Sequence, residues 1–441
     1  MARDRMLVLA ACYLTILSVG ENSTAIMAAL PTMTSGLGLG PATVEWIVNA
    51  YLLASAVFII LGGEAADQFG ARRSSAAGTA LFALASLIVA LALDGVMVIG
   101  ARALQGVGAA FAVASTLAAV SQTVPDWDRG RAIGAWTGFL MLGFSIGPLV
   151  GGAVTHYAGW RVNFWLNVAL MLPAAMALWL NPDAAGRHTR RVDWLGLGLL
   201  AIFMVTLVQG LRAMGAGVSN PGAPIAPLGL AALAFVALLR LETRHDRPLF
   251  DFGLFRSRNF ALACALVFLL MSDILGILLY YNLFAQSPDG LGRTPIAAGF
   301  SLMPLSAALF GFAQIAPWLA TAFGLRRMMV AGSLLLALGC AIAWASVTHA
   351  GFAALMLGLC VVGAGIALPY ASAPRIGLAA LAPTQTGKGS GMLNSCSFLG
   401  GTVGVTGGGI AFGVAGFEGV LMLVGLSALL IAGLCLGIRD P

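Results

Sequence analysis

The chain has 441 residues, of which 60% are hydrophobic and only 9% charged, and its formal net charge is +6. A water-soluble protein of this length needs more polar surface than this composition provides, so most of the surface must face lipid. The positive charge does not indicate nucleic-acid binding, because the basic residues lie in short loops between apolar runs.

The apolar runs are about twenty residues long and lack strict alternation, which favours membrane-spanning helices over a β-barrel. The first run follows a basic start and is too long for a cleaved signal peptide, so we expect it to remain as the first helix. We predict fourteen spans, near residues 7–30, 46–63, 74–93, 97–123, 131–156, 162–180, 194–211, 224–240, 259–285, 299–322, 328–347, 352–374, 388–412 and 420–438.

The basic residues predict which loops face the cytoplasm. With the amino terminus inside, all but four of the 23 Lys and Arg residues fall in cytoplasmic loops or termini. The four exceptions are Arg102, Arg161, Arg212 and Arg293. By the positive-inside rule, and because the number of spans is even, we expect both termini in the cytoplasm and the chain in the inner (cytoplasmic) membrane.

One loop sequence is repeated. Residues 63–73 and 317–327 both end in Phe-Gly-x-Arg-Arg, at an offset of 327 − 73 = 254 residues that also carries the first span onto the ninth. We therefore predict an all-α membrane protein with two pseudo-symmetric six-helix bundles, 1–181 and 259–441. Two additional helices with basic cytoplasmic linkers lie between them, in 182–258. Two such bundles around a site near mid-membrane are a known plan of secondary transporters.

Four short motifs deserve comparison with known transporters. The loop between the second and third spans carries Gly63, Asp67, Gly70, Arg72 and Arg73. The fourth span holds an arginine in the stretch 101–108, and the first span holds the stretch 22–31, which begins at an asparagine and ends at a proline. The fifth-span motif is rich in glycine and consists of Gly143, Gly147, Pro148, Gly151 and Gly152.

In these motifs the chain resembles the fourteen-span drug:proton antiporters of the major facilitator superfamily, over nearly its whole length. The resemblance implies the major facilitator fold, alternating access and a proton gradient as the energy source. Two loop positions, Gln68 and Ala71, usually carry basic residues in the family. The acidic residue of the first-span motif is here Asn22, with Glu21 one position earlier, which turns the carboxylate by about 100° around the helix.

Two acids lie deep in predicted spans, Glu21 in the first and Asp273 in the ninth, each about 21 Å beyond the start of its apolar run. A charge at that depth is costly, so such an acid usually faces a cavity, a partner or a proton path. We predict that one or both carry the coupled proton, because a carboxyl group that alternates between dry and cation-rich surroundings takes up and releases protons. The alternative is a neutral acid that hydrogen-bonds two helices.

Arg102 lies at a depth similar to that of Glu21. The resemblance implies that it assists proton transfer, and a Glu21–Arg102 ion pair is physically sensible. The alternative is an arginine that snorkels to the outer interface.

Polar or amphipathic groups inside spans can line a substrate cavity, although hydrogen bonds between helices account for most of them. The candidates for substrate binding are Asn22, Tyr51, Tyr280 and Asn394.

The glycine-rich motifs are candidate gating elements. Gly143, Gly147 and Gly151 recur every four residues and Pro148 lacks a backbone donor, so the fifth span can pack closely and bend. This face either packs within its bundle or lines the surface along which the bundles rock. The loop 63–73 is either a tight turn with topology charges or a cytoplasmic latch, in which Asp67 pairs with an arginine or a helix amino terminus.

No nucleotide loop, catalytic triad or metal-ligand cluster emerges from the sequence. We therefore predict a monomer that is not an enzyme, holds no cofactor or metal, binds no nucleic acid, and works with a small-molecule substrate, protons and membrane lipid. Proton-coupled export of a small lipophilic compound or drug is the preferred function. The alternatives are a metabolite importer or facilitator of the same fold, and a non-transporting membrane receptor.

Overall fold

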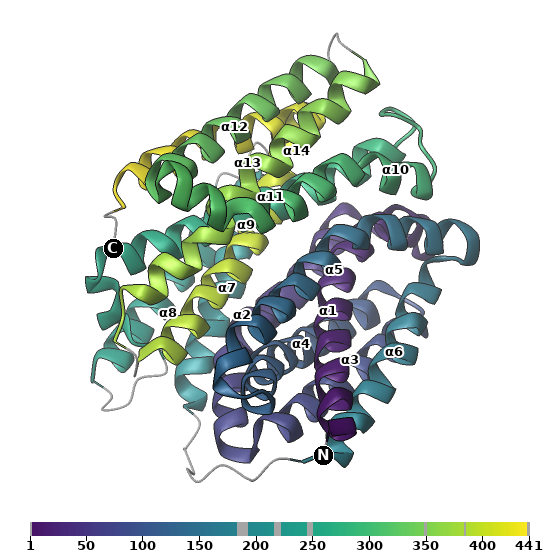
Figure 1. Cartoon of the computed structure of the whole chain (residues 1–441). Helices are drawn as coiled ribbons and strands as arrows, with labels where there is room; N and C mark the ends of the chain where they lie inside the picture. The colour runs from purple at the N-terminus through teal and green to yellow at the C-terminus, as the bar shows by residue number, and fades with distance from the viewer. Residues whose placement is uncertain are drawn as a thin grey trace. The chain divides into compact units, whose positions relative to one another are not determined.

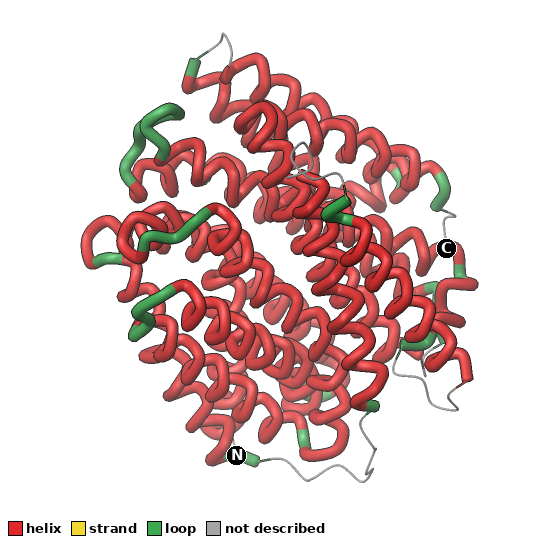
Figure 2. Tube along the Cα trace, turned by 180° about the vertical axis from the view of Figure 1, so that it is seen from behind, coloured by secondary structure: helices red, strands yellow, loops and turns green. Residues whose placement is uncertain are grey.

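In a computed structural model, the described part of the chain consists of helices joined by short loops (Figures 1 and 2). Thirteen of its helices are long and apolar enough to cross a membrane. The predicted basic linkers around 183–192 and 245–249 lie outside the described residues. The structure describes residues 2–182, 193–215, 222–244, 250–347, 351–382 and 385–438.

Contacts divide the chain into two compact units. Unit 1 comprises Met1–Val192 and Arg293–Phe300, and unit 2 comprises Asp193–Gly292 and Ser301–Pro441. The helices of unit 1 are α1 (Ala2–Leu37), α2 (Pro41–Phe69), α3 (Ala71–Ala90), α4 (Gly95–Thr123), η1 (Asp126–Asp128), α5 (Arg129–Ala158), α6 (Trp160–Leu180) and nearly all of α10 (Pro295–Ser301). Those of unit 2 are α7 (Trp194–Gly215), α8 (Ile225–Arg244), η2 (Phe252–Arg256), α9 (Arg258–Gln286), α11 (Met303–Phe323), α12 (Leu325–Ala345), α13 (Phe352–Ala379) and α14 (Thr386–Leu436).

The longest helix, α14, contains two predicted spans. It has 51 residues, and its backbone leaves helical geometry at Ala415 and Gly416, where the glycine adopts a φ of 59°. This break separates 386–414 from 417–436, and each part is about long enough for one crossing. The described residues therefore contain the fourteen apolar segments predicted from the sequence.

The tenth span differs from its prediction. It begins at Pro295 instead of near residue 299, and it is interrupted between α10 and α11. Pro304, in the first turn of α11, has no N–H to donate to the preceding turn, which is sufficient to interrupt the helix there.

The two units pair their helices in the same scheme. In unit 1, α5 packs on α1, α4 packs on α2 and α3, and α6 packs on α3. In unit 2, α14 packs on α9 and α12, and α13 packs on α11 and α12. This correspondence is expected of an internal repeat. The predicted bundle boundaries stay predictions; in the structure the additional helices α7 and α8 group with unit 2.

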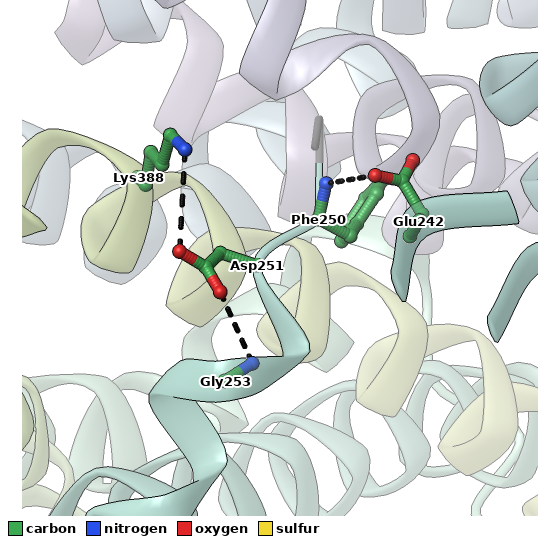
Figure 3. A network of polar contacts seen from close by, with 5 residues as sticks. All are labelled: Glu242, Phe250, Asp251, Gly253 and Lys388. Carbon is green, nitrogen blue, oxygen red and sulfur yellow. Dashed lines mark hydrogen bonds and ion pairs between the residues drawn. The ribbon is translucent and has the colours of Figure 1, made fainter. Parts of the chain in front are cut away.

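Polar contacts hold the end of α8 and the following loop within unit 2 (Figure 3). Glu242 is buried near the end of α8, and its carboxylate accepts a hydrogen bond of 3.2 Å from the N–H of Phe250. Asp251 accepts from the N–H of Gly253 at 3.1 Å and lies 4.0 Å from the ammonium group of Lys388, in the first turn of α14. The loop between α8 and α9 is thereby connected to α14.

Close backbone contact between α1 and α5 depends on glycines. A Cβ atom at Gly147 would overlap the hydroxyl of Thr24, and one at Gly151 would overlap the backbone of Ala25. Unit 2 repeats the arrangement, because a Cβ atom at Gly404 of α14 would overlap the backbone of Ser272 in α9. Small residues thus let α1 in unit 1 and α9 in unit 2 approach their main neighbours, as at many membrane helix interfaces.

We expect Gly147→Ala to destabilise the protein by roughly 1–3 kcal/mol, because the added methyl group forces α1 and α5 apart. The measurement is the melting temperature of the purified protein in detergent. Gly134→Ala is the matched control, since a Cβ atom at Gly134 on the same helix meets no atom within 4 Å. A Gly147→Ala variant that melts at or above the wild-type temperature would contradict this packing.

Candidate functional site

A buried polar cluster surrounds Arg102 in unit 1. The Arg102 side chain is fully buried, although it belongs to an apolar helix, α4. Its Nη1 donates to Asn22 Oδ1 at 2.8 Å and to Gln105 Oε1, and its Nε donates to the carbonyl oxygen of Ile47 at 3.1 Å. The guanidinium carbon lies 4.3 Å from the ring centroid of Tyr51, within cation–π range. One cation therefore joins α1, α2 and α4.

Two further hydrogen bonds extend this cluster. The hydroxyl groups of Tyr51 and Ser23 lie 3.2 Å apart, and Gln105 Nε2 donates to Ser86 Oγ of α3 at 2.7 Å. Among the residues that the structure describes, Nη2 of Arg102 has no hydrogen-bond partner. The cluster thus presents a buried cation whose hydrogen-bond acceptors are all neutral and which keeps one nitrogen for another acceptor.

Arg102 pairs with Asn22 and not with Glu21. The expected Glu21–Arg102 ion pair is not found among the described contacts, and Glu21 is half-buried. Adjacent residues of a helix point about 100° apart. When Asn22 points toward α4, Glu21 therefore points in a different direction. The backbone of Glu21 lies against Gly143 and Gly147 of α5. The snorkelling alternative is also wrong, because the Arg102 guanidinium is buried and hydrogen-bonded inside the unit.

The acid of unit 2 has a protein partner. Asp273 of α9 is 3% exposed, and its Oδ2 accepts a hydrogen bond of 3.0 Å from Ser427 of α14. The contact joins two helices, as in the alternative of a helix-bridging acid. It involves a single neutral donor and includes no cation.

The other candidates of unit 2 make structural hydrogen bonds. Tyr280 is buried, donates to the carbonyl oxygen of Val405 in α14 at 2.7 Å, and packs its ring 5.2 Å from that of Phe412. Asn394 is half-buried and donates to Ser390 of its own helix at 2.9 Å. These contacts are the kind expected of helix packing, and substrate binding by the two residues stays a prediction.

The arginines after the α2–α3 turn have different surroundings. Gly70 forms the turn with a φ of 94°, which favours glycine. Arg72 donates to the carbonyl oxygen of Asn181 and to Thr123 Oγ1, both at 3.2 Å, and so joins α3 to the ends of α4 and α6. Arg73 is exposed. Hydrogen bonds therefore hold the Arg72 side chain in place, whereas the Arg73 side chain is exposed.

The remaining gating candidates divide into three groups. Gly143, Gly147 and Gly151 face α1 within unit 1. Gly152 faces α10, because a Cβ atom at Gly152 would overlap the carbonyl oxygen of Pro295. In the same way, a Cβ atom at Gly299 of α10 would overlap the carbonyl oxygen of Pro148. Asp67 is exposed, and Gly63 has open space beside it. A latch role for Asp67 stays a prediction.

Residues 12–320 match the family model of the Major Facilitator Superfamily. The chain belongs to the major facilitator superfamily. It is 30% identical over 413 residues to the multidrug resistance protein Stp of Mycobacterium tuberculosis, which covers 92% of this chain and 75% of that protein. It is 31% identical over 324 residues to the tetracenomycin C resistance and export protein of Streptomyces glaucescens, covering 73% of this chain and 60% of the relative. It is also 30% identical over 289 residues to the methylenomycin A resistance protein of Bacillus subtilis, covering 64% of this chain and 61% of that protein.

As a major facilitator, the chain is a multi-pass membrane transporter and not an enzyme. The described polar groups inside its apolar helices hold helices together, as the contacts of Arg102 and Asp273 show. Four residues in the contacts of the Arg102 cluster and of Asp273 were not predicted as site residues: Ser23, Ser86, Gln105 and Ser427. Gln105 had a signal, because it lies one helical turn after Arg102 on the same face.

We expect the substitution Arg102→Lys to lower the free energy of unfolding by roughly 1–3 kcal/mol. An ammonium group lacks the planar fork of guanidinium and cannot reach Asn22, Gln105 and Ile47 together. The melting temperature in detergent tests this. Arg161→Lys is the control, because Arg161 is exposed and donates to one carbonyl oxygen, that of Ala92, at 2.9 Å. If both variants melt alike, the Arg102 contacts do not stabilise the unit.

Proposed function

We propose that this transporter exports small lipophilic organic compounds in exchange for protons across the cytoplasmic membrane, by alternating access. The observation that carries the proposal is that each unit holds a polar centre inside helices long and apolar enough to cross a membrane, namely the Arg102 cluster with Glu21 next to Asn22 in unit 1, and Asp273 in unit 2. The names of the relatives, which describe multidrug resistance, tetracenomycin C export and methylenomycin A resistance, support export as the direction. In this proposal the protein works as a monomer without a cofactor and takes its energy from the proton gradient.

Glu21 is the proposed proton carrier of unit 1. It is half-buried, so it is neither fully exposed nor sealed in the core, and on α1 it immediately precedes Asn22, which contacts Arg102. In the conformation described, Arg102 contacts Asn22 instead of Glu21, so we propose that a rotation of α1 during transport brings the Glu21 carboxylate under the attraction of this cation. Protonation removes that attraction. The protonation state of Glu21 can therefore change how α1 and α4 interact, which couples a proton to a helix movement.

Asp273 is the proposed second proton site. Its one described hydrogen bond comes from a serine hydroxyl, which can donate to a carboxylate and can accept from a carboxylic acid. Both protonation states therefore keep a partner, and the cost of burying the acid is reduced in each. Asn22 and Tyr51 are the proposed substrate contacts of unit 1, because their polar and aromatic groups lie next to Arg102.

In everted vesicles with an imposed pH gradient, acid inside, we expect the wild-type protein to accumulate a fluorescent lipophilic cation such as ethidium. Glu21→Gln and Asp273→Asn should each lower the initial rate, and the double variant should reduce accumulation to background because no titratable acid remains at either centre.

Asp289→Asn is the matched control, since Asp289 is an exposed acid in a loop of unit 2 and should leave the rate unchanged. Full accumulation by the double variant would remove the proton-coupling roles of both acids. Downhill entry that ignores the pH gradient would indicate a facilitator instead of an exporter.

A further inference from the structure

A groove of about 450 Å³ lies in unit 1 beside the turn between α2 and α3, apart from the Arg102 cluster. The end of α2 contributes Phe69, and the first two turns of α3 contribute Arg73, Ser74 and Ala77. Phe111 of α4 and Trp179 of α6 complete the apolar wall. The groove thus combines a polar end at the start of α3 with an apolar wall.

The polar end contains a buried hydroxyl group with an unused hydrogen bond. Ser74 is 5% exposed, and among the described residues its Oγ has no hydrogen-bond partner. A buried serine in a helix usually donates its hydroxyl to a carbonyl oxygen of the preceding turn. The adjacent Ser75 does so, because its Oγ donates to the carbonyl oxygen of Ala71 at 2.7 Å. A buried hydroxyl group that lines a groove and makes no such bond indicates a ligand that accepts from it.

The same end carries positive charge. Arg73 is exposed and lines the groove, whereas Arg72 donates to Asn181 and Thr123 on another side. The helix α3 starts directly after Gly70, which provides no capping side chain. The amino terminus of α3 carries the positive end of the helix dipole, which favours an anion there. A guanidinium, a hydroxyl and a helix amino terminus together suit a phosphate group.

The apolar wall and its position identify the rest of the ligand. Phe69 and Trp179 are 56% and 64% exposed and stand at the ends of the spans α2 and α6, where aromatic side chains meet the membrane interface. Phe111 lies further along α4, inside the span. A ligand that fills the groove needs a phosphate at one end and hydrocarbon at the other.

We infer that this groove binds an anionic phospholipid, whose phosphate is held by Arg73 and Ser74 near the amino terminus of α3, and whose acyl chain lies against Phe111 and Trp179. Basic pockets between membrane helices take lipid headgroups in the same manner. In the orientation predicted from the arginine distribution, the lipid belongs to the cytoplasmic leaflet. The inference does not depend on the transported substrate or on proton coupling.

Quenching of Trp179 fluorescence by brominated lipids tests the inference. The full-length protein is placed in phosphatidylcholine vesicles that contain increasing fractions of either brominated phosphatidylglycerol or brominated phosphatidylcholine. The difference between wild type and Trp179→Phe isolates the signal of Trp179. We expect half-maximal quenching at a phosphatidylglycerol fraction about fivefold lower than the phosphatidylcholine fraction, as one arginine at the surface implies.

Arg73→Gln should remove this preference, and Ser74→Ala should reduce it by a smaller factor. Arg327→Gln and Ser75→Ala are the matched controls. Arg327 is the exposed arginine at the repeated position in unit 2, and the Ser75 hydroxyl is bonded within its own helix, so both variants should keep the preference. Ala77→Phe, at an exposed position in the groove, should abolish the preference by filling the space while the melting temperature stays at the wild-type value.

Equal quenching by the two brominated lipids would overturn the inference, and so would a preference that survives Arg73→Gln. Displacement of the brominated lipid by soluble glycerol 3-phosphate would also overturn it, because the site would then serve a free phosphate compound.

Discussion

The burial of one guanidinium group constrains the packing of the first four helices of unit 1. A cation without access to water persists only where the surrounding helices supply acceptors for its N–H groups. The acceptors of Arg102 come from α1, α2 and α4, and Gln105 transmits the contact to Ser86 on α3. A rotation of α1 by one residue would turn Asn22 away by about 100°. The cluster therefore fixes the rotation of each helix as well as its distance.

The glycines of α5 complete this arrangement from the other side of α1. At Gly147 the two helices are so close that the hydroxyl of Thr24 occupies the space of a side chain and donates to the carbonyl oxygen of Phe144 at 3.1 Å. The helix α1 is thus held between α4, through a polar contact, and α5, through backbone contact. Glu21 and Asn22 are adjacent in sequence yet belong to these two different environments, which separates the titratable group from the fixed cation.

Most of the fold could be predicted because bilayer thickness sets the length of each apolar run. The interruption at Leu302 was missed because a proline near the start of a span is compatible with an unbroken helix. In the site, Asn22, Tyr51 and Arg102 were predicted as separate candidates, and the structure brings them together. Arg102 contacts Asn22 and not Glu21 because of the directions in which these two side chains leave α1. Sequence spacing does not determine which of them faces α4.

The contact of Asp273 with Ser427 joins residues 154 positions apart and had no periodic signal in the sequence. The groove near Ser74 was missed for a different reason. The sequence shows two adjacent arginines and two adjacent serines, and only the fold reveals that Arg72 and Ser75 make hydrogen bonds within the unit while Arg73 and Ser74 line the groove.

The two units share a packing scheme but differ in the polar groups that it holds. Glycines contact α1 at Gly147 and α9 at Gly404, because any side chain there would overlap backbone or a tightly packed hydroxyl group. The side chains of Arg102 and Asp273 are not among the atoms closest to these glycines, so the same steric limit does not apply to them. Each unit holds a different set of polar residues. Unit 1 holds a fixed cation at Arg102, and unit 2 holds an acid at Asp273. A repeated scaffold can thus keep its helix contacts while each copy presents a different charge to the chemistry of transport.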